Sequence, residues 1–412
     1  MTEKEKKMER EKLLGTVVPK GVLKMVPIVV LRTVLRLVPA ALTAAFLIVL
    51  CTICTSAKEN PVAVEPEEWE NFVQSIPEES LSAFPDGALE DTDSFGEAVE
   101  QMSGFEYISG EITAALGVEL EGAVRLATGL CAILVLSAVF SCAGSSTGNG
   151  ALLSAVRFCS AGALFATVIY TQYSHFSAIE RFFSSVTHLM EGMIPITASV
   201  WAMGGNLSTA AVGSSSFYVA LGICNRLFAK SIIPIAAVMS VLALCDAMSD
   251  EMKTGRMLAA LKKIYFFFLT LVMSVLLSAM SAQTAIASAS DSATARTARL
   301  VSGSVIPILG GGVGETLRTV AGGVTYLKNV LGIGGILMIF FLLLPVGLSV
   351  LLTRAVFLFT GGLADILGCS GEARLLENLG EVYGCILSVI SAVAVTFVLA
   401  LCIFIKTVVA VA

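Results

Sequence analysis

The sequence predicts an all-α protein with several membrane-spanning helices, and three observations support this prediction. Of the 412 residues, 56% are hydrophobic and only 14% are charged, whereas a soluble domain usually carries about 25% charged residues. Long apolar stretches follow one another from Leu126 onward, and the mean hydropathy of the chain is +0.86. Pro and Gly interrupt several of these stretches, which predicts broken helices packed against protein or a water-filled cavity.

Residues 1–57 have the pattern of an export signal. Nine Lys and Arg lie in the first 36 residues, and an apolar run follows from Leu37 to Ile53. Small residues come next, at Thr55 and Ala57. The pattern fits a cleaved signal peptide, and the long basic head also fits an uncleaved signal anchor. Both interpretations place the following segment outside the cytoplasm.

Residues 58–125 are predicted to form an acidic extracytoplasmic arm. Seventeen of the 32 Asp and Glu lie between Lys58 and Val124, and Lys58 is the only base there. A basic head and an acidic segment on either side of an apolar run indicate topology. The arm is either a solvated spacer or a docking arm for a partner. Because no basic patch persists beyond the head, we expect no nucleic-acid partner.

Residues 126–412 are predicted to form a multi-span membrane domain with five to eight spans. A helix needs about 20 apolar residues to cross the hydrocarbon core. The basic cluster Lys253, Arg256, Lys262 and Lys263 is expected on the cytoplasmic side. The spanning candidates are 126–146, 158–172, 264–283, 329–353 and 384–405. The stretches interrupted by Pro or Gly are 193–228, 232–248, 303–323 and 355–368.

The second half of the membrane domain repeats the order of several residues of the first half. This similarity predicts an internal repeat of about 158–265 and 270–383. Membrane transport folds are often built from such repeats, with broken helices meeting near the midplane. Chance similarity between apolar sequences is the alternative. The matching pairs are Pro195 with Pro307, Pro234 with Pro345, Arg256 with Arg374, and Tyr265 with Tyr383.

A glycine-rich segment holds Gly310, Gly311, Gly312 and Gly314. A P-loop needs a Lys after its last Gly, but Glu315 stands there and would repel phosphate. We therefore expect these glycines to allow close helix packing or to line a cavity, and we expect Gly332→Leu in the following span to be milder than Gly311→Leu or Gly314→Leu. The nearest charged residues either lie in an interfacial loop or line a polar path. They are Glu315, Arg318 and Lys328.

The sequence offers no recognisable catalytic or metal-binding motif. Its two histidines, His175 and His188, do not form H-E-x-x-H, and G-x-S-x-G is absent. The ten cysteines lie almost entirely in apolar stretches, which argues against a disulfide framework. We therefore expect no enzymatic activity, no metal and no cofactor.

Three stretches of this sequence resemble the stage III sporulation protein AE family of spore-forming Firmicutes. They are Thr294–Leu300, Val305–Gly311 and Tyr326–Gly335. The plan of a signal segment, an extracytoplasmic arm and a multi-span membrane part is also similar. The resemblance implies a role in endospore formation, within a multiprotein assembly in the mother-cell membrane that surrounds the forespore. It implies no catalytic residues.

The expected function is that of a membrane-embedded structural or channel subunit of this assembly. The expected partners are the lipid bilayer and other membrane subunits, with an ATPase subunit as a further candidate. The alternative is a self-contained secondary transporter or permease built on the repeat. An intramembrane enzyme is disfavoured by the missing motifs.

Overall fold

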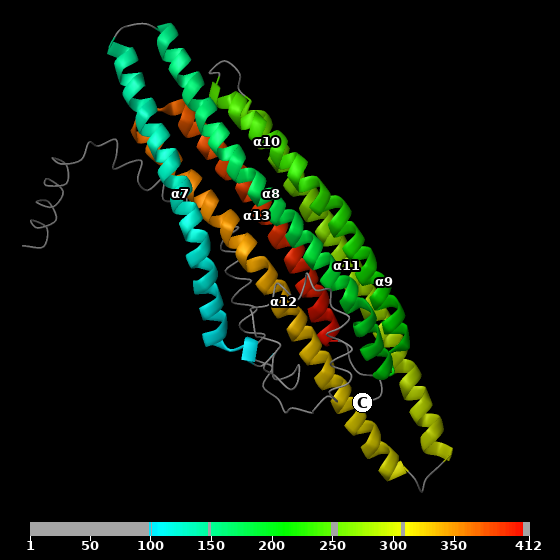
Figure 1. Ribbon diagram of the computed structural model, residues 1–412. Coiled ribbons are helices and arrows are strands. Elements are labelled where there is room, and N and C mark those ends of the chain that lie inside the picture. Colours follow the sequence, from blue (N-terminus) through cyan, green and yellow to red (C-terminus); the bar gives the residue numbers. More distant parts are fainter. Residues whose placement is uncertain (1–98, 100, 147–149, 249–253, 306–309, 407–412) are drawn as a thin grey trace, which may run out of the picture. The chain divides into compact units, whose positions relative to one another are not determined.

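The computed structural model describes residue 99 and residues 101–406, apart from 147–149, 249–253 and 306–309 (Figure 1). The chain divides into two compact units, Met1–Cys51 and Thr52–Ala412, and all described residues belong to the second. The predicted signal segment and most of the acidic arm therefore lie outside the described residues. The long described elements are all helical: α7 (Phe105–Ser146), α8 (Gly150–Met203), α9 (Leu207–Ile223), the π-helix η1 (Cys224–Ala229), α10 (Lys230–Met248), α11 (Gly255–Val305), α12 (Gly310–Ile366) and α13 (Ser370–Lys406).

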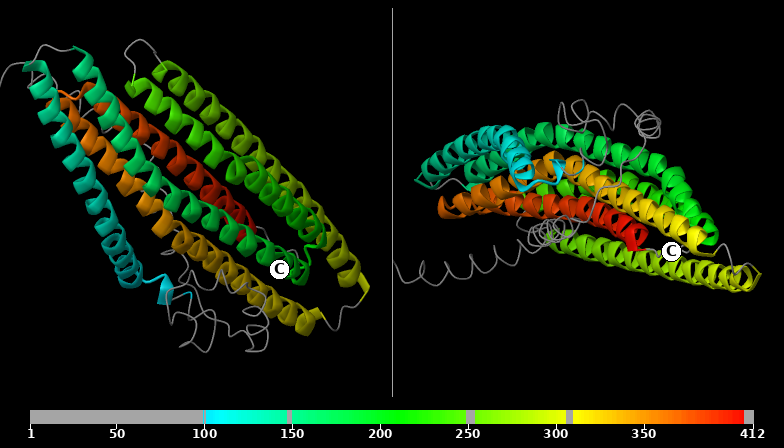
Figure 2. Two further views of the ribbon diagram at one scale, coloured as in Figure 1. Left: turned by 45° about the horizontal axis from the view of Figure 1, so that its top comes forward. Right: turned by 90° about the horizontal axis from the view of Figure 1, so that it is seen from below.

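Helix α13 is the central element of the described unit. It packs along α12 and also contacts α8, α10 and α11 (Figure 2). Helix α12 in turn contacts α7 and α8. A helix that is apolar around its whole circumference must be buried, and α13 carries apolar side chains on nearly every face of its second half. The buried apolar core of the unit therefore lies around the α12–α13 pair, where the other helices pack against it.

The outer helices expose large apolar side chains. Val139 of α7 is 60% exposed and Phe267 of α11 is 69% exposed. Isolated exposed apolar residues are ordinary, but extended apolar patches mark a surface that is covered by lipid or protein. Among the described residues, five segments are long and apolar enough to cross a membrane: Phe105–Gly144, Leu207–Met248, Gly255–Ala293, Lys328–Ile366 and Ser370–Ile405.

These segments confirm the polytopic helical class and add one detail to the predicted spans. The candidate 158–172 lies in α8 and stays a prediction, because it needs the residues before it to reach spanning length and most side chains of 150–157 lie outside the described ones. The stretches 193–228 and 232–248 contribute a spanning candidate, since α9, η1 and α10 form one continuous helical element.

The prolines do not break the helices as the sequence suggested. Pro195, Pro234 and Pro345 lie inside α8, α10 and α12. An interior proline removes one backbone hydrogen bond, but neighbouring helices and Ser or Thr side chains make this tolerable in a membrane. The hydroxyl of Ser199 donates to the carbonyl of Pro195 at 2.9 Å.

Two departures from regular α-helix do occur between α8 and α10. The first is the turn at Gly204 and Gly205, where Gly205 has a φ of 77° that a side chain would strain. The second is the π-helix η1, which holds the exposed Arg226. π-helical turns inside α-helices are rare and frequent at functional sites.

The internal repeat stays a prediction. The order of elements is compatible with it, because Pro234 and Pro345 each lie in the helix that precedes the one carrying Tyr265 or Tyr383. Pro307, the proposed partner of Pro195, lies outside the described residues.

We expect Ser94 and Thr254 to lie on opposite sides of the membrane, with Thr254 in the cytoplasm beside the basic cluster. This topology requires that α7, α8 and the α9–α10 element, which separate the two sites, each cross the membrane once. Single cysteines at each position, in a variant without the native cysteines, can be labelled with a membrane-impermeant maleimide on intact cells. Equal labelling of both positions before lysis would contradict this topology.

Candidate functional site

The first half of α13 carries polar side chains that meet polar or aromatic partners on the surrounding helices. Ionisable residues inside a membrane domain are rare and costly, so they mark a functional site by default. Four contacts make up this polar layer, and each joins α13 to a different part of the unit.

The first contact surrounds Glu372, in the first turn of α13. Its side chain is only 2% exposed. The hydroxyl of Ser137 on α7 donates to Oε1 of Glu372 at 2.6 Å, and the hydroxyl of Ser160 on α8 donates to the same oxygen. The thiol of Cys369, which precedes α13, lies 3.9 Å from the Ser137 hydroxyl. Glu372 thus joins three helices.

The second contact surrounds Tyr383, which is completely buried. Its ring meets the edge of His175 on α8 at 5.6 Å and of Phe357 on α12 at 5.2 Å, measured between ring centroids. The Tyr383 hydroxyl has no hydrogen-bond partner within the part of the chain that the structure describes. The buried guanidinium of Arg354 lies beside Gly384, where a Cβ would stand 3.1 Å from its central carbon.

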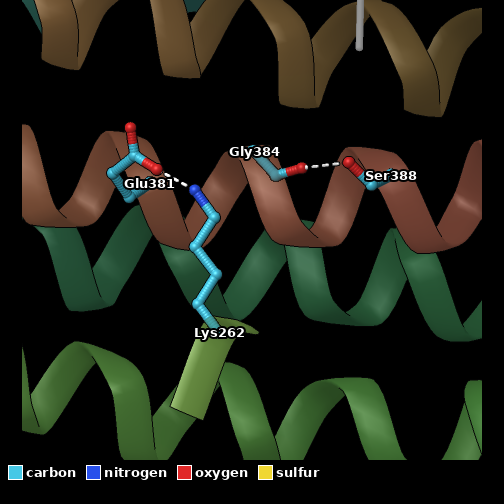
Figure 3. Close-up of polar contacts among 4 residues, drawn as sticks. All are labelled: Lys262, Glu381, Gly384 and Ser388. Atoms are coloured by element: carbon cyan, nitrogen blue, oxygen red, sulfur yellow. Dashed lines mark hydrogen bonds and ion pairs between the residues drawn. The ribbon is translucent and has the colours of Figure 1, made fainter. Parts of the chain in front are cut away.

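The third contact is an ion pair between Lys262 of α11 and Glu381 of α13 (Figure 3). Further along α13, the hydroxyl of Ser388 donates to the carbonyl of Gly384 at 2.8 Å. Because both side chains of the ion pair are partly shielded from solvent, the pair is held more firmly than one on an open surface.

The fourth contact ties α10 to the starts of α11 and α13. Asp246 accepts the backbone N–H of Gly255 at 2.6 Å, which satisfies a free donor at the start of α11. The other carboxylate oxygen accepts the side-chain amide of Asn378 on α13 at 3.2 Å. A carboxylate is favoured at this position by the positive end of the helix dipole.

A similar cap lies at the far end of α11, where Asp291 holds the start of α9. The buried carboxylate accepts the backbone N–H of Ser208 at 3.0 Å and of Thr209 at 2.8 Å. Replacing Asp291 with Ala removes the acceptor of two backbone donors, one of them on the buried Thr209, so we expect the free energy of unfolding to fall by about 2 kcal/mol. A denaturant titration of the purified protein measures this loss. Asp365→Ala, at the exposed end of α12, is the control, and an equal loss in both variants would contradict the cap.

Several of the residues singled out from the sequence lie in or near this layer. Tyr265 is buried, and its hydroxyl lies 3.2 Å from the Ser231 hydroxyl. Lys328 is buried in α12, Arg374 is half-buried in α13, and Arg256 is exposed at the start of α11. Tyr383, described above, and Arg374 both belong to the first half of α13. Tyr265, Lys328 and Arg256 are not brought together in one place.

The glycine-rich segment forms the start of α12, but its surroundings lie outside the described residues. The same holds for the side chains of Glu315 and Arg318 and for Pro307. The proposals that the glycines pack closely and that these charges line a polar path therefore stay predictions. Within the described residues, no group of three or more His, Cys, Asp or Glu could hold a metal ion.

Two buried charged residues that were not predicted as site residues could have been found from the sequence pattern. Arg354 is the one charged residue between Lys328 and Asp365, and Asp291 is the one between Lys263 and Arg296. An isolated charge in a long apolar run is expected to face the protein interior. Glu372 had no such signal, because it lies among other charged residues at the start of α13.

The exposed apolar faces and the buried polar layer define a polytopic helical membrane protein with an ionisable interior. Comparison with known families gives a narrower assignment. The model of the stage III sporulation protein AE family matches residues 94–408, so the chain belongs to this family.

One curated relative is similar over part of the chain. Stage III sporulation protein AE of Bacillus subtilis (strain 168) is 22% identical over 221 residues. The match covers 54% of this chain and 55% of the relative, so the two align over about half of their lengths. No solved structure matches the chain.

Proposed function

We propose that this protein is a membrane-embedded structural or channel subunit of the sporulation assembly that links the mother cell and the forespore. The observation that carries the proposal is the match of the sporulation family over most of the chain. The protein would lie in the mother-cell membrane around the forespore, with its acidic arm in the intermembrane space. Its partners would be other membrane subunits and an ATPase subunit, and its role would not be enzymatic.

The fold supports this role in one respect. The polar side chains at the start of α13 meet partners on α7, α8, α10, α11 and α12, while apolar side chains cover the outer helices. Polar groups inside and apolar groups outside are what a subunit needs if it passes or anchors polar material within a bilayer.

Two measurements test the proposal in the organism that encodes the protein. Deletion of the gene should reduce the yield of heat-resistant spores by several orders of magnitude, and an intact copy should restore it. Affinity purification from sporulating cells in mild detergent should recover other membrane proteins with the tagged chain. A normal spore yield would overturn the role in sporulation. A tagged chain that restores spores but copurifies with no other membrane protein would instead favour the self-contained transporter.

A further inference from the structure

Helix α8 carries a polar face that points away from the rest of the unit. Its members are exposed or half-exposed and recur at intervals of three or four residues, which is the spacing of a single helical face. They are Ser177, Glu180, Arg181, Ser184, His188 and Glu191. We refer to these six residues as the polar face of α8.

Contacts with α12 and α13 place this face beside the two most apolar of the five spanning candidates. Near one end of the face, the ring of His175 meets the ring of Tyr383 on α13. Near the other end, Met193 and Leu401 both come within 3.2 Å of the position that a Cβ would take at Gly335 of α12. His175 and Met193 are 18 residues apart, which is about 27 Å along a helix, and the hydrocarbon core is about 30 Å thick. Where α12 and α13 cross the membrane with these apolar runs, the polar face of α8 lies at the depth of the hydrocarbon core.

Helix α11 has an apolar surface over the same interval. Its Lys262 pairs with Glu381 of α13, and its Met273 sulfur lies 3.0 Å from the Thr396 hydroxyl. Between these two contacts with α13, Phe267 is 69% exposed. At one depth, therefore, the unit presents apolar side chains on α11 and polar side chains on α8.

Lipid covers the apolar surface of α11 well, but it is a poor cover for the polar face of α8. Charged residues at membrane depth are costly, and they almost always face protein or a water-filled cavity. Glu180, Arg181 and Glu191 are three such residues on one exposed face. Because Glu180 and Arg181 are adjacent and opposite in charge, a surface that matches them must carry the same two charges in exchanged places.

We propose that the polar face of α8 packs against the same face of a second copy of this chain, about a two-fold axis parallel to the membrane normal. Two copies with the same orientation in the membrane hold residues of equal number at equal depth. Glu180 of each copy then meets Arg181 of the other, so the face is its own complement, as a two-fold interface requires. The chain's acidic arm is a poorer match, because two of the three charged residues on the face are carboxylates.

The spacing along α8 also suits two helices side by side. Tyr170, Ser177, Ser184 and Glu191 recur every seven residues, which is the repeat of helices that wind around each other in a left-handed sense. Serines at two successive positions of this seam are small enough to let the helices approach closely, as small residues do at helix interfaces in membranes.

Disulfide cross-linking of the full chain in isolated membranes tests the pairing. In a variant without the native cysteines, Ser184→Cys should form a disulfide-linked dimer on oxidation with copper phenanthroline, because the two thiols face each other across the axis. Ser274→Cys is the matched control, since Ser274 is an exposed serine on α11 beside Met273. We expect at least fivefold more dimer from Ser184→Cys on a non-reducing gel. No dimer, or equal amounts from the two variants, would overturn the proposal.

A charge exchange tests the contact between Glu180 and Arg181 in the Ser184→Cys background. Arg181→Glu sets carboxylates against carboxylates, so the dimer yield should fall at least fivefold. Combining it with Glu180→Arg restores opposite pairs and should return the yield to within twofold of the starting level. Failure of this rescue, with normal membrane insertion on an immunoblot, would contradict the pairing. Where Arg181→Glu lowers insertion itself, the comparison of Ser184→Cys with Ser274→Cys decides.

The other cover for the polar face is a water-filled space, and a labelling measurement distinguishes it. Complete reaction of Ser184→Cys with a membrane-impermeant maleimide in opened membranes, together with no disulfide-linked dimer, would show that the face borders water and would exclude the second copy. None of these measurements uses spore yield, so the pairing can fail while the proposed role in sporulation stands, and the reverse also holds.

Discussion

Gly213→Ala is expected to lower the free energy of unfolding by about 2 kcal/mol, although alanine is the better helix former. A Cβ at Gly213 would overlap the six-membered ring of Trp201. That indole is 1% exposed, lies parallel to Phe217 at 6.0 Å and meets the edge of Phe404 at 5.2 Å. Because Trp201 is confined on both sides, the overlap must be relieved by moving α9 away from α8.

Gly222→Ala provides a matched control on the same helix. A Cβ at Gly222 meets nothing within 4 Å, so the substitution should raise the free energy of unfolding by up to about 1 kcal/mol through helix propensity. The two alanine variants therefore differ in sign, which a denaturant titration of purified protein resolves. Stabilisation by both would show that α9 does not pack against Trp201 as described.

The helical membrane class could be predicted from the sequence because it depends on composition alone. The apolar runs that begin after Lys263, Lys328 and Tyr383 each needed only their length and their lack of charge to be recognised. The proline positions could not be judged in the same way. Whether Pro234 breaks a helix depends on how neighbouring helices satisfy the backbone, and this information lies in other parts of the chain.

The polar layer was beyond prediction because its members come together only through packing. Glu372 and Ser137 are 235 residues apart in the chain, and Lys262 and Glu381 are 119 apart. Nothing near Ser137 distinguishes it from the other serines of the apolar stretches, since its role arises from the α7–α13 contact. Tyr265 and Tyr383 were paired by sequence pattern, yet one hydroxyl meets Ser231 while the Tyr383 ring packs between His175 and Phe357.

The α12–α13 contact gives Gly332 a packing role that the sequence did not indicate. From the sequence, Gly332→Leu was expected to be milder than Gly311→Leu or Gly314→Leu, and this ranking stays a prediction. In the structure a Cβ at Gly332 would overlap Ile405 of α13, and one at Gly335 would lie 2.9 Å from Leu401. Small residues at these positions let the two helix backbones approach closely, which is how helices associate in membranes where the hydrophobic effect cannot drive them together.

Gly332→Leu is therefore expected to be among the most damaging single substitutions in the membrane domain. Forcing a leucine into a packed interface costs about 1–3 kcal/mol or more, and here it separates the central helix from its main neighbour. Spore yield should fall at least tenfold in the organism that encodes the protein, together with the resistance of the purified protein to denaturant. The amount of protein inserted in the membrane, measured by immunoblot, should fall less than the spore yield.

Gly362→Leu is the control for this substitution, because Gly362 lies on the exposed face of the same helix with nothing within 4 Å of its Cβ position. A leucine there adds apolar surface toward the bilayer and should leave spore yield unchanged. Gly311→Leu and Gly314→Leu complete the series: a loss like that of Gly332→Leu would support close packing at the start of α12, and normal yields would make that segment an ordinary helix end. If Gly332→Leu and Gly362→Leu have equal effects, the tight contact between Gly332 and Ile405 does not exist in the membrane.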